Sequence, residues 1–265
     1  MVSSRIALIR APNPSPMTLS GTNSYIINCG NGEAICIDPG PAIPAHVDAL
    51  RSHCERNALT LKWICLTHGH PDHAPAAALL HERTGAPVAA HERAGVAIDR
   101  SLRDGDTVAA GDVALQVADA PGHSGDHVVF YEPGERALFT GDVVLGAGYV
   151  AVLPPEGDMR AYMHTLARLR EEFADARAIY GGHGDPVSDP VAKLDDYLEH
   201  RRARERQILA ALAAGERTSA QLVESIYADT DRSLWNVAAL QLRAHLDKLV
   251  QDGLVKLRGE RYRLS

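Results

Sequence analysis

The chain has 265 residues, of which 45% are hydrophobic and 23% charged, and its formal net charge is −7. This composition is typical of a water-soluble globular protein, and the length suits one large domain or a catalytic domain with a small appendage. No apolar run approaches the roughly 18 residues that a membrane-spanning helix needs, which excludes a membrane-embedded protein. The N-terminal segment lacks the residue order of a secretory signal, so we expect a cytoplasmic protein with no membrane partner.

Four cysteines lie in the first quarter of the chain, and none forms a CxxC pair. Cys36 and Cys65 sit inside apolar runs that look like strands. A reducing compartment leaves such residues as buried free thiols. We therefore predict four unpaired cysteines without a catalytic role.

Strands and helices alternate up to about residue 190. Apolar runs bounded by Gly, Pro, Asn and Asp predict strands, and apolar positions three or four residues apart predict helices. The polar residues of interest come just after strand ends, where α/β and sandwich enzymes display reactive groups. We expect a β-hairpin over 24–38, helices over 45–56, 74–84 and 159–173, and strands over 63–67, 88–90, 113–118, 128–131, 137–140 and 178–180.

The pattern changes after Asp189, where helices predominate. Three helices followed by a hairpin outline a winged-helix module, so we predict a catalytic domain over 1–198 and a winged-helix-like domain over 199–265. Residues 200–265 carry 12 Lys or Arg and 8 Asp or Glu, and a solvated helical face explains this excess as well as a polyanionic partner does. The expected elements cover 191–214, 218–227, 234–252 and 254–264.

The strongest local signal is the motif Thr67-His68-Gly69-His70-Pro71-Asp72-His73, directly after an expected strand. Three histidines and an aspartate within six residues can surround metal ions, because imidazole and carboxylate are ligands that Zn, Fe and Mn accept. His68 and His70 alternate along an extended turn and can reach one ion. Asp72 and His73 leave the turn on its other side and can reach a neighbouring ion.

Three further strand ends offer ligands of the same kind, namely His123, Asp142 and His183. Each alone is a weak signal, but together, in this order and spacing, they are specific. The other histidines show no such clustering and are interpreted as surface or packing residues. For His127, which lies close to His123 in the sequence, we favour a structural role over one beside the metal ligands.

Asn23 and Tyr25 lie where the first predicted hairpin begins. Their polar side chains could line the cleft of an enzyme. A turn that enters the hairpin explains the same residues without any function. We give the two interpretations equal weight.

From about residue 17 to residue 185, the chain resembles the metallo-β-lactamase superfamily through these motifs. The resemblance implies an αββα sandwich with two divalent metal ions at one edge of its sheets, with Zn expected and Mn or Fe also accepted. In that family the HxHxDH motif contributes to both metal sites, and the later His, Asp and His complete them. Carried over, the first ion would bind His68, His70 and His123, the second Asp72, His73 and His183, and Asp142 would bridge the two.

The chemistry that the resemblance implies is metal-dependent hydrolysis. Two cations about 4 Å apart lower the pKa of a bridging water enough to give hydroxide near neutral pH. The hydroxide attacks a carbonyl carbon or a phosphorus atom, and the cations stabilise the charge that develops on oxygen. Asp72 is the expected catalytic residue, because it can orient the nucleophile or handle its proton.

The substrate is less closely defined, because this fold serves many hydrolases. Asp142 indicates that β-lactam turnover is at most incidental, since true β-lactamases of the superfamily usually carry Cys or Ser there. Beyond the metal motifs, the chain resembles β-lactamase-like endoribonucleases with a C-terminal winged helix, which implies cleavage of single-stranded RNA. This resemblance rests on residues 13–25, 141–146, 200–202, 207–209 and 226–227.

Two other functions stay open. The protein could hydrolyse a small thioester, ester or lactone, with the C-terminal module serving dimerisation or covering the cleft. It could instead be a nucleic-acid-binding regulator with a vestigial site, although an intact set of seven ligands argues against a dead enzyme. Only 5% of the residues are aromatic, and the sequence shows no Arg-rich stripe or aromatic ladder suited to single strands.

Overall fold

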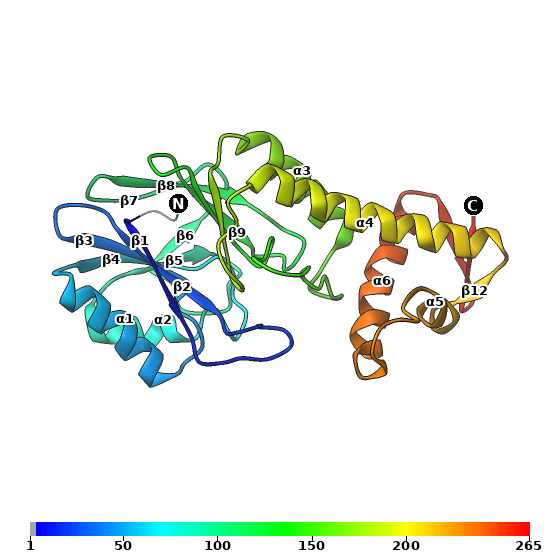
Figure 1. Cartoon of the computed structure of the whole chain (residues 1–265), viewed down its shortest axis with the longest axis horizontal. Helices are drawn as coiled ribbons and strands as arrows, with labels where there is room; N and C mark the ends of the chain where they lie inside the picture. Colours follow the sequence, from blue (N-terminus) through cyan, green and yellow to red (C-terminus); the bar gives the residue numbers. More distant parts are fainter. Residues whose placement is uncertain (1–3) are drawn as a thin grey trace.

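The computed structural model describes residues 4–265, and two β-sheets packed face to face form the larger part of the molecule (Figure 1). The first sheet has six strands and the second five. In the order in which they pair, the strands of the first sheet are β1 (Ile6–Arg10), β2 (Asn23–Asn28), β3 (Glu33–Ile37), β4 (Thr60–Cys65), β5 (Val88–His91) and β6 (Arg100–Leu102), and those of the second are β11 (Ala178–Gly181), β10 (Ala137–Gly141), β9 (Val128–Glu132), β8 (Val113–Asp119) and β7 (Thr107–Ala110).

Helices cover the outer face of each sheet and complete an αββα sandwich, as predicted. The helices α1 (Pro44–Arg56) and α2 (Ala76–Thr84) pack on the first sheet. The helix α3 (Met159–Glu172) and the first half of α4 (Pro190–Ala213) pack on the second. The edge of the sandwich beside α4 is the one that faces the C-terminal part of the chain (Figure 1).

The central strands β3, β9 and β10 are buried on both faces, which explains why they are mostly apolar. In β2, Tyr25 and Ile27 point between the sheets, whereas Ile26 packs under the helices. In β9, Phe130 lies between the sheets and Tyr131 lies on the side of α3. This alternation follows from the two-residue period of a strand and fixes which loops reach the open edge.

Most of the predicted elements are present, with ends shifted by a few residues. The predicted strand at 63–67 ends at Cys65, because the backbone of Thr67 instead donates to the Asp38 carboxylate. The strands β1, β6 and β7 were not predicted, since each is short and pairs at or near a sheet edge. All four cysteines are buried and unpaired, as expected. Among residues 4–265, no helix combines the length and apolar character needed to cross a membrane.

The C-terminal part is a winged helix, also as predicted. Thr218 caps its second helix through a capping box with Gln221. Its core joins the second half of α4 to the following helices and the hairpin. These elements are β12 (Arg217–Thr218), α5 (Ser219–Ile226), the 3₁₀-helix η1 (Arg232–Leu234), α6 (Trp235–Gln251), β13 (Val255–Arg258) and β14 (Arg261–Leu264).

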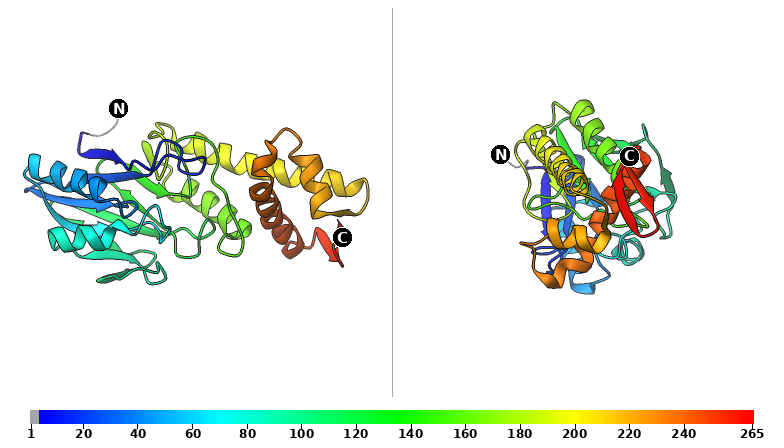
Figure 2. Two further views of the ribbon diagram at one scale, coloured as in Figure 1. Left: turned by 90° about the horizontal axis from the view of Figure 1, so that it is seen from below. Right: turned by 90° about the vertical axis from the view of Figure 1, so that its right-hand side faces the viewer.

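The helix α4 runs without a break across the predicted domain boundary at residue 199 (Figure 2). Leu194 belongs to the core beside the second sheet, and Ile208 to the core of the winged helix. We propose that the division lies within this helix. The second link between the two parts is α6, because the Gln241 side chain accepts a hydrogen bond from the backbone of Val152 at 2.9 Å. The winged helix is thus held against the edge that carries the polar loops.

Candidate metal centre and the pocket beside it

Two glycines let the ligand-bearing loops approach each other closely. A Cβ atom on Gly69 would lie 2.0 Å from the carbonyl oxygen of Ala94, so only glycine fits between the first two histidines of the motif. A Cβ atom on Gly182 would lie 2.3 Å from Oδ1 of Asp142 and 2.6 Å from Cε1 of His73. Any side chain at residue 182 would therefore intrude among the predicted ligands.

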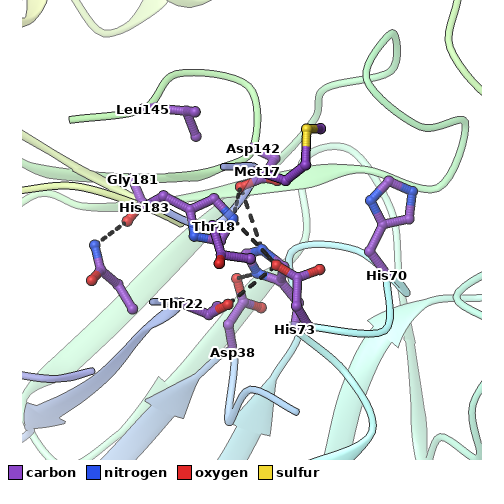
Figure 3. A network of polar contacts seen from close by, with 12 residues as sticks. Met17, Thr18, Thr22, Asp38, His70, His73, Asp142, Leu145, Gly181 and His183 are labelled. Carbon is purple, nitrogen blue, oxygen red and sulfur yellow. Dashed lines mark hydrogen bonds and ion pairs between the residues drawn. The ribbon is translucent and has the colours of Figure 1, made fainter. Parts of the chain in front are cut away.

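The structure brings all seven predicted ligand residues together at the open edge of the sandwich. Figure 3 shows His73, Asp142 and His183 pointing toward one another, with Asp38 beside His73. The seven residues come from four separate loops, each of which follows a strand. They form three overlapping groups whose ligand atoms lie within 4.8 Å of one another: His68, His70 and His123; Asp72, His73 and His183; and His68, His73 and Asp142.

In the first group, hydrogen bonds to acceptors fix which imidazole nitrogen faces the cluster. Nδ1 of His123 donates to the carbonyl of Ala151 at 3.0 Å, and Nε2 of His70 donates to the carboxylate of Glu156 at 3.3 Å. The other two nitrogens, Nε2 of His123 and Nδ1 of His70, then carry lone pairs and lie 3.0 Å apart. Two lone pairs at this distance repel each other unless a cation or a proton lies between them.

Asp38 anchors two of the histidines at once. Its Oδ2 accepts hydrogen bonds from the Thr67 hydroxyl at 2.7 Å and from Nδ1 of His73 at 2.9 Å. Because the Thr67 hydroxyl gives its proton to Asp38, it accepts from Nδ1 of His68 at 3.0 Å. The Nε2 atoms of His68 and His73 face the cluster, and neither has a hydrogen-bond partner among the described residues.

Asp142 lies between the two groups of histidines. Its Oδ1 is 3.3 Å from Nε2 of His73 and 3.4 Å from Nε2 of His183, and its Oδ2 is 3.7 Å from Nε2 of His123. Nε2 of His183 also lies 3.2 Å from Oδ2 of Asp72, while its Nδ1 donates to a backbone carbonyl. One carboxylate thus offers one oxygen to each group.

This donor set fits two divalent cations. Metal-bound histidines commonly donate from one nitrogen to a carbonyl or carboxylate and bind the metal with the other. Four of the five histidines here have one nitrogen in a hydrogen bond of this kind, and His68 donates to the Thr67 hydroxyl, which in turn donates to Asp38. Buried polar atoms without partners cost free energy unless a ligand satisfies them. Nε2 of His68, Nε2 of His73 and Oδ1 of Asp142 are such atoms. Imidazole and carboxylate together suit Zn, Mn or Fe.

The carboxylates and histidines of the site strongly shift one another's pKa values. Burial would raise the pKa of Asp142, but His73 and His183 outweigh it and hold that pKa well below its usual range. Burial opposes ionisation of Asp72 too, yet its hydrogen bond with His183 brings the pKa to about 2. Burial would lower the pKa of His183, but Asp142 and Asp72 raise it to about 9. The carboxylates are ionised at neutral pH, and a bound cation would replace protons on the facing histidines.

A large pocket of about 830 Å³ opens directly onto the predicted ligands. His70, Asp72, His123, Asp142 and His183 form one end of it. Its side walls are mostly apolar and come from the loop before β2, the loop after β10 and the helix α6 of the winged helix. The apolar wall residues include Met17, Leu19, Leu145, Tyr149, Val150, Leu153, Leu234, Val237 and Ala238.

Sequence reasoning missed the part played by Asp38, because Asp38-Pro39-Gly40 has the composition of an ordinary turn. It also undervalued His127, whose ring stacks on His68 at 4.6 Å and whose Nε2 accepts from the backbone of Asp142 at 3.1 Å. The cleft-lining interpretation of Asn23 and Tyr25 is wrong. Both are buried and donate hydrogen bonds to the carbonyl of Gly181, in the segment that leads to His183.

Comparison with known families gives two matches that together span most of the chain. Residues 17–183 match the model of the metallo-beta-lactamase superfamily. Residues 218–262 match the model of the beta-lactamase associated winged helix domain. The two matches fall on the two parts that the structure shows, the sandwich and the C-terminal module.

Individual proteins resemble the chain over nearly its full length. A "Beta-lactamase-like protein 2 homolog" of Caenorhabditis elegans is 32% identical over 96% of this chain and 87% of its own. An "Atrochrysone carboxyl ACP thioesterase" of Aspergillus chevalieri is 28% identical over 98% of this chain and 83% of its own. A metallo-beta-lactamase family protein of Thermus thermophilus shares the fold, with a TM-score of 0.82, 24% identity and full coverage of both chains.

Proposed function

This chain belongs to the metallo-beta-lactamase superfamily of hydrolases, and we propose that it hydrolyses an acyl thioester or ester with an apolar chain. The observation that carries this proposal is the continuity of the pocket. The predicted ligands form one end of a cavity of about 830 Å³, and mostly apolar side chains form its walls. A cavity of this size and lining suits a substrate whose reactive carbonyl lies at the ligands and whose apolar chain extends away from them.

Divalent cations, when bound by the seven ligands, supply charge that activates water and stabilises a developing oxyanion. The chain's own residues hold the rest of the site in place. Asp72 accepts a hydrogen bond from the Thr22 hydroxyl at 3.1 Å and remains ionised at neutral pH, since its pKa is about 2. It also borders the pocket, so it can accept a hydrogen bond from the incoming water and orient it toward the carbonyl carbon.

Hydrolysis of a thioester adds water to the carbonyl carbon, breaks the carbon–sulfur bond, and yields a carboxylic acid and a thiol. The thioesterase of Aspergillus chevalieri, similar over 98% of this chain, supports a substrate of this class. The relatives named above include lactamase-like and thioesterase proteins, and their names do not specify RNA. The narrower resemblance to endoribonucleases therefore stays a prediction.

The orientation of α6 argues against binding of a nucleic-acid duplex by the winged helix in the helix-turn-helix manner. In helix-turn-helix proteins the last helix of the motif contacts the nucleic acid. Here Val237, Gln241 and His245 of α6, spaced along one helical face, border the pocket beside the catalytic domain. That face is occupied by the pocket, so it is not free to enter a groove of a duplex.

The test is a side-by-side assay of the protein loaded with Zn or Mn. The substrates are acetyl, octanoyl and dodecanoyl thioesters of one thiol, a lactone, a β-lactam and labelled single-stranded RNA. We expect thioester hydrolysis that disappears on chelation and in His73→Ala, but persists in His164→Ala, a matched exposed histidine. Cleavage of RNA with the thioesters untouched would contradict the acyl substrate and favour the ribonuclease function.

A further inference from the structure

Two arginines border the pocket without an acidic partner. Arg201 on α4 is only 2% exposed, and Arg204 lies one turn further along the same helix. Neither forms an ion pair with a carboxylate anywhere in residues 4–265. A buried cation usually has such a partner, because removing its charge from water is costly.

Other charges nearby are already compensated. Glu205, the next acidic residue along α4, pairs with Lys248 at 3.0 Å. Asp196 lies 3.8 Å from Nζ of Lys193 and accepts a hydrogen bond from the Tyr149 hydroxyl at 2.8 Å. Arg201 therefore relies on a hydrogen bond to the carbonyl of Val150 and on the ring of Tyr162 at 5.3 Å. These contacts carry no negative charge.

Arg204 is held ready by its surroundings. Its guanidinium lies 4.3 Å from the ring centroid of Tyr227, and its Nη1 donates to the Gln207 side chain and to the Ile226 carbonyl. Its Nε and Nη2 atoms have no hydrogen-bond partner in the described structure. A guanidinium fixed in this way can bind a planar or tetrahedral oxyanion with its remaining donors.

Further polar atoms around the arginines lack hydrogen-bond partners among the described residues. They are buried, and they belong to side chains that border the same pocket. Gln241 uses its Oε1 to accept from Val152, which leaves its Nε2 hydrogens as donors. The atoms are Nδ1 of His200, Oη of Tyr227, Nε2 of Gln241 and Nε2 of His245.

The local potential is positive. Burial, followed by the charges of Arg201 and Arg204, lowers the pKa of His200 to about 4. Burial also lowers the pKa of His245, with the Glu205 carboxylate 3.7 Å away opposing this shift and the two arginines contributing to it. Both imidazoles are neutral at pH 7, so the arginines are the charges that an entering group meets here.

We propose that this region of the pocket, the arginine end (His200, Arg201, Arg204, Tyr227 and Gln241), binds an oxyanion of the substrate distant from the bond that is hydrolysed. The oxyanion is a carboxylate at the far end of the acyl chain or a phosphate on the arm that carries the sulfur. Guanidinium and amide donors suit either group. The proposal rests on the proposed hydrolase function for the scissile bond, but the anion site itself is independent of turnover.

The first test compares substrates that differ only in the distal charge. One pair is glutaryl and pentanoyl thioesters of the same neutral thiol, and the other is the same acyl group on phosphopantetheine and on pantetheine. We expect the wild-type protein to prefer the charged member of one pair, through KM. Arg204→Gln should reduce that preference about 10- to 100-fold, the effect of losing a charged hydrogen bond. Arg204→Lys should restore part of it.

Arg202→Gln is the matched control, because Arg202 is exposed on the neighbouring position of the same helix. Preference for the carboxylate pair would locate the oxyanion on the acyl chain, and preference for the phosphate pair would locate it on the thiol arm. Equal treatment of charged and neutral members by the wild-type protein, or an equal loss in Arg204→Gln and Arg202→Gln, would overturn the proposal.

A binding measurement separates this proposal from the proposed function. Isothermal titration of the cation-loaded protein with phosphopantetheine, pantetheine, glutarate and pentanoate needs no hydrolysis. Charge-dependent binding that Arg204→Gln weakens, in a protein without thioester turnover, would support the anion site and contradict the acyl hydrolase function. Thioester turnover without any charge-dependent binding would support the acyl hydrolase function and contradict the anion site. Circular dichroism and thermal unfolding establish that each variant is folded.

Discussion

The two ends of the pocket are built in opposite ways. At the metal end, each predicted ligand histidine is oriented by a partner behind it, such as Asp38 behind His73 or the Ala151 carbonyl behind His123. At the arginine end, Arg201 has no carboxylate partner and the Nε2 of Gln241 has no partner at all within the described residues. The first end is preorganised for fixed ions, and the second presents unsatisfied donors to whatever enters.

The two ends also differ in how their residues are distributed along the sequence. The metal end is supplied by loops of the sandwich, each of which carries its ligands in a short local motif. The arginine end exists only because α4 continues into the winged helix and α6 folds back against the catalytic domain. If both proposals hold, the sandwich sets the reaction and the C-terminal module shapes the choice of substrate.

The largest expected effect is that of Asp142→Asn. The change removes the carboxylate that faces both groups of histidines, so both predicted cation sites would lose charge and a shared ligand. We expect a loss of bound cation and a fall in kcat/KM on the order of 10³ or more for every substrate. Metal content by plasma emission spectrometry, together with turnover, is the measurement. Retention of two cations per chain with normal turnover would contradict the role of Asp142.

Asp38→Asn should have a smaller effect that tests the anchoring of the metal end. An amide nitrogen in place of Oδ2 would face the Nδ1–H of His73, and the hydrogen bond would be lost. We expect a decrease of about 10- to 100-fold in cation affinity or in activity. Asp48→Asn, at an exposed carboxylate far from the ligands in sequence, is the control. Equal behaviour of the two variants would show that Asp38 does not orient the ligands.

Val237→Phe tests whether α6 limits the substrate. Val237 is half-buried and borders the pocket, so a larger ring shortens the space for an apolar chain. We expect kcat/KM for a dodecanoyl thioester to fall about 10-fold or more relative to the acetyl thioester. The added ring would displace part of the long acyl chain from the pocket, and each methylene group displaced costs about 1–3 kcal/mol of transition-state binding. Asn236→Ala, on the neighbouring exposed residue, should leave the chain-length profile as it is. An equal loss of kcat/KM for both thioesters would show that the acyl chain does not lie beside Val237.

The smallest expected effect is a pH dependence of stability at the arginine end. His200 is held neutral in the folded protein, with a pKa of about 4, by burial and by Arg201 and Arg204; His245 and Asp196 also face it. The unfolded chain takes up this proton near pH 6.5. Protonation of His200 in the unfolded chain therefore does not affect the free energy of unfolding above about pH 6.5, and it lowers that free energy progressively as the pH falls toward about 4.

Urea unfolding between about pH 7 and pH 4 measures this contribution. His200→Phe keeps a ring for the stack on Tyr149, whose centroid lies 3.7 Å away, but cannot take up a proton. Its free energy of unfolding should therefore decrease less than that of the wild-type protein over this range. The same decrease in both proteins would show that His200 titrates normally.

The fold and the metal end could be predicted to a large extent because their signals are local. The alternation of strand residues, the spacing of apolar residues in helices and the motif from Thr67 to His73 can each be recognised within a short stretch of sequence. The contribution of Asp38 could not be predicted, since it depends on β3 and β4 lying side by side, and that pairing places the carboxylate against Thr67.

The arginine end was beyond sequence reasoning for a similar reason. Arg201 and Arg204 have the pattern of a solvated helical face, and only the packing of α6 and α5 around α4 buries the first and stacks the second on Tyr227. The strand β1 was missed because its alternation is interpretable only once it pairs with β2. Features created by contacts between distant segments leave little trace in the local pattern.

The most direct test of the central claim is anomalous X-ray diffraction from crystals of the protein grown with Zn or Mn, collected above and below the absorption edge of the metal. We predict two peaks, one among His68, His70 and His123 and one among Asp72, His73 and His183, both beside Asp142. The absence of any peak within reach of these seven residues, in crystals that contain the metal, would contradict the two-metal hydrolase.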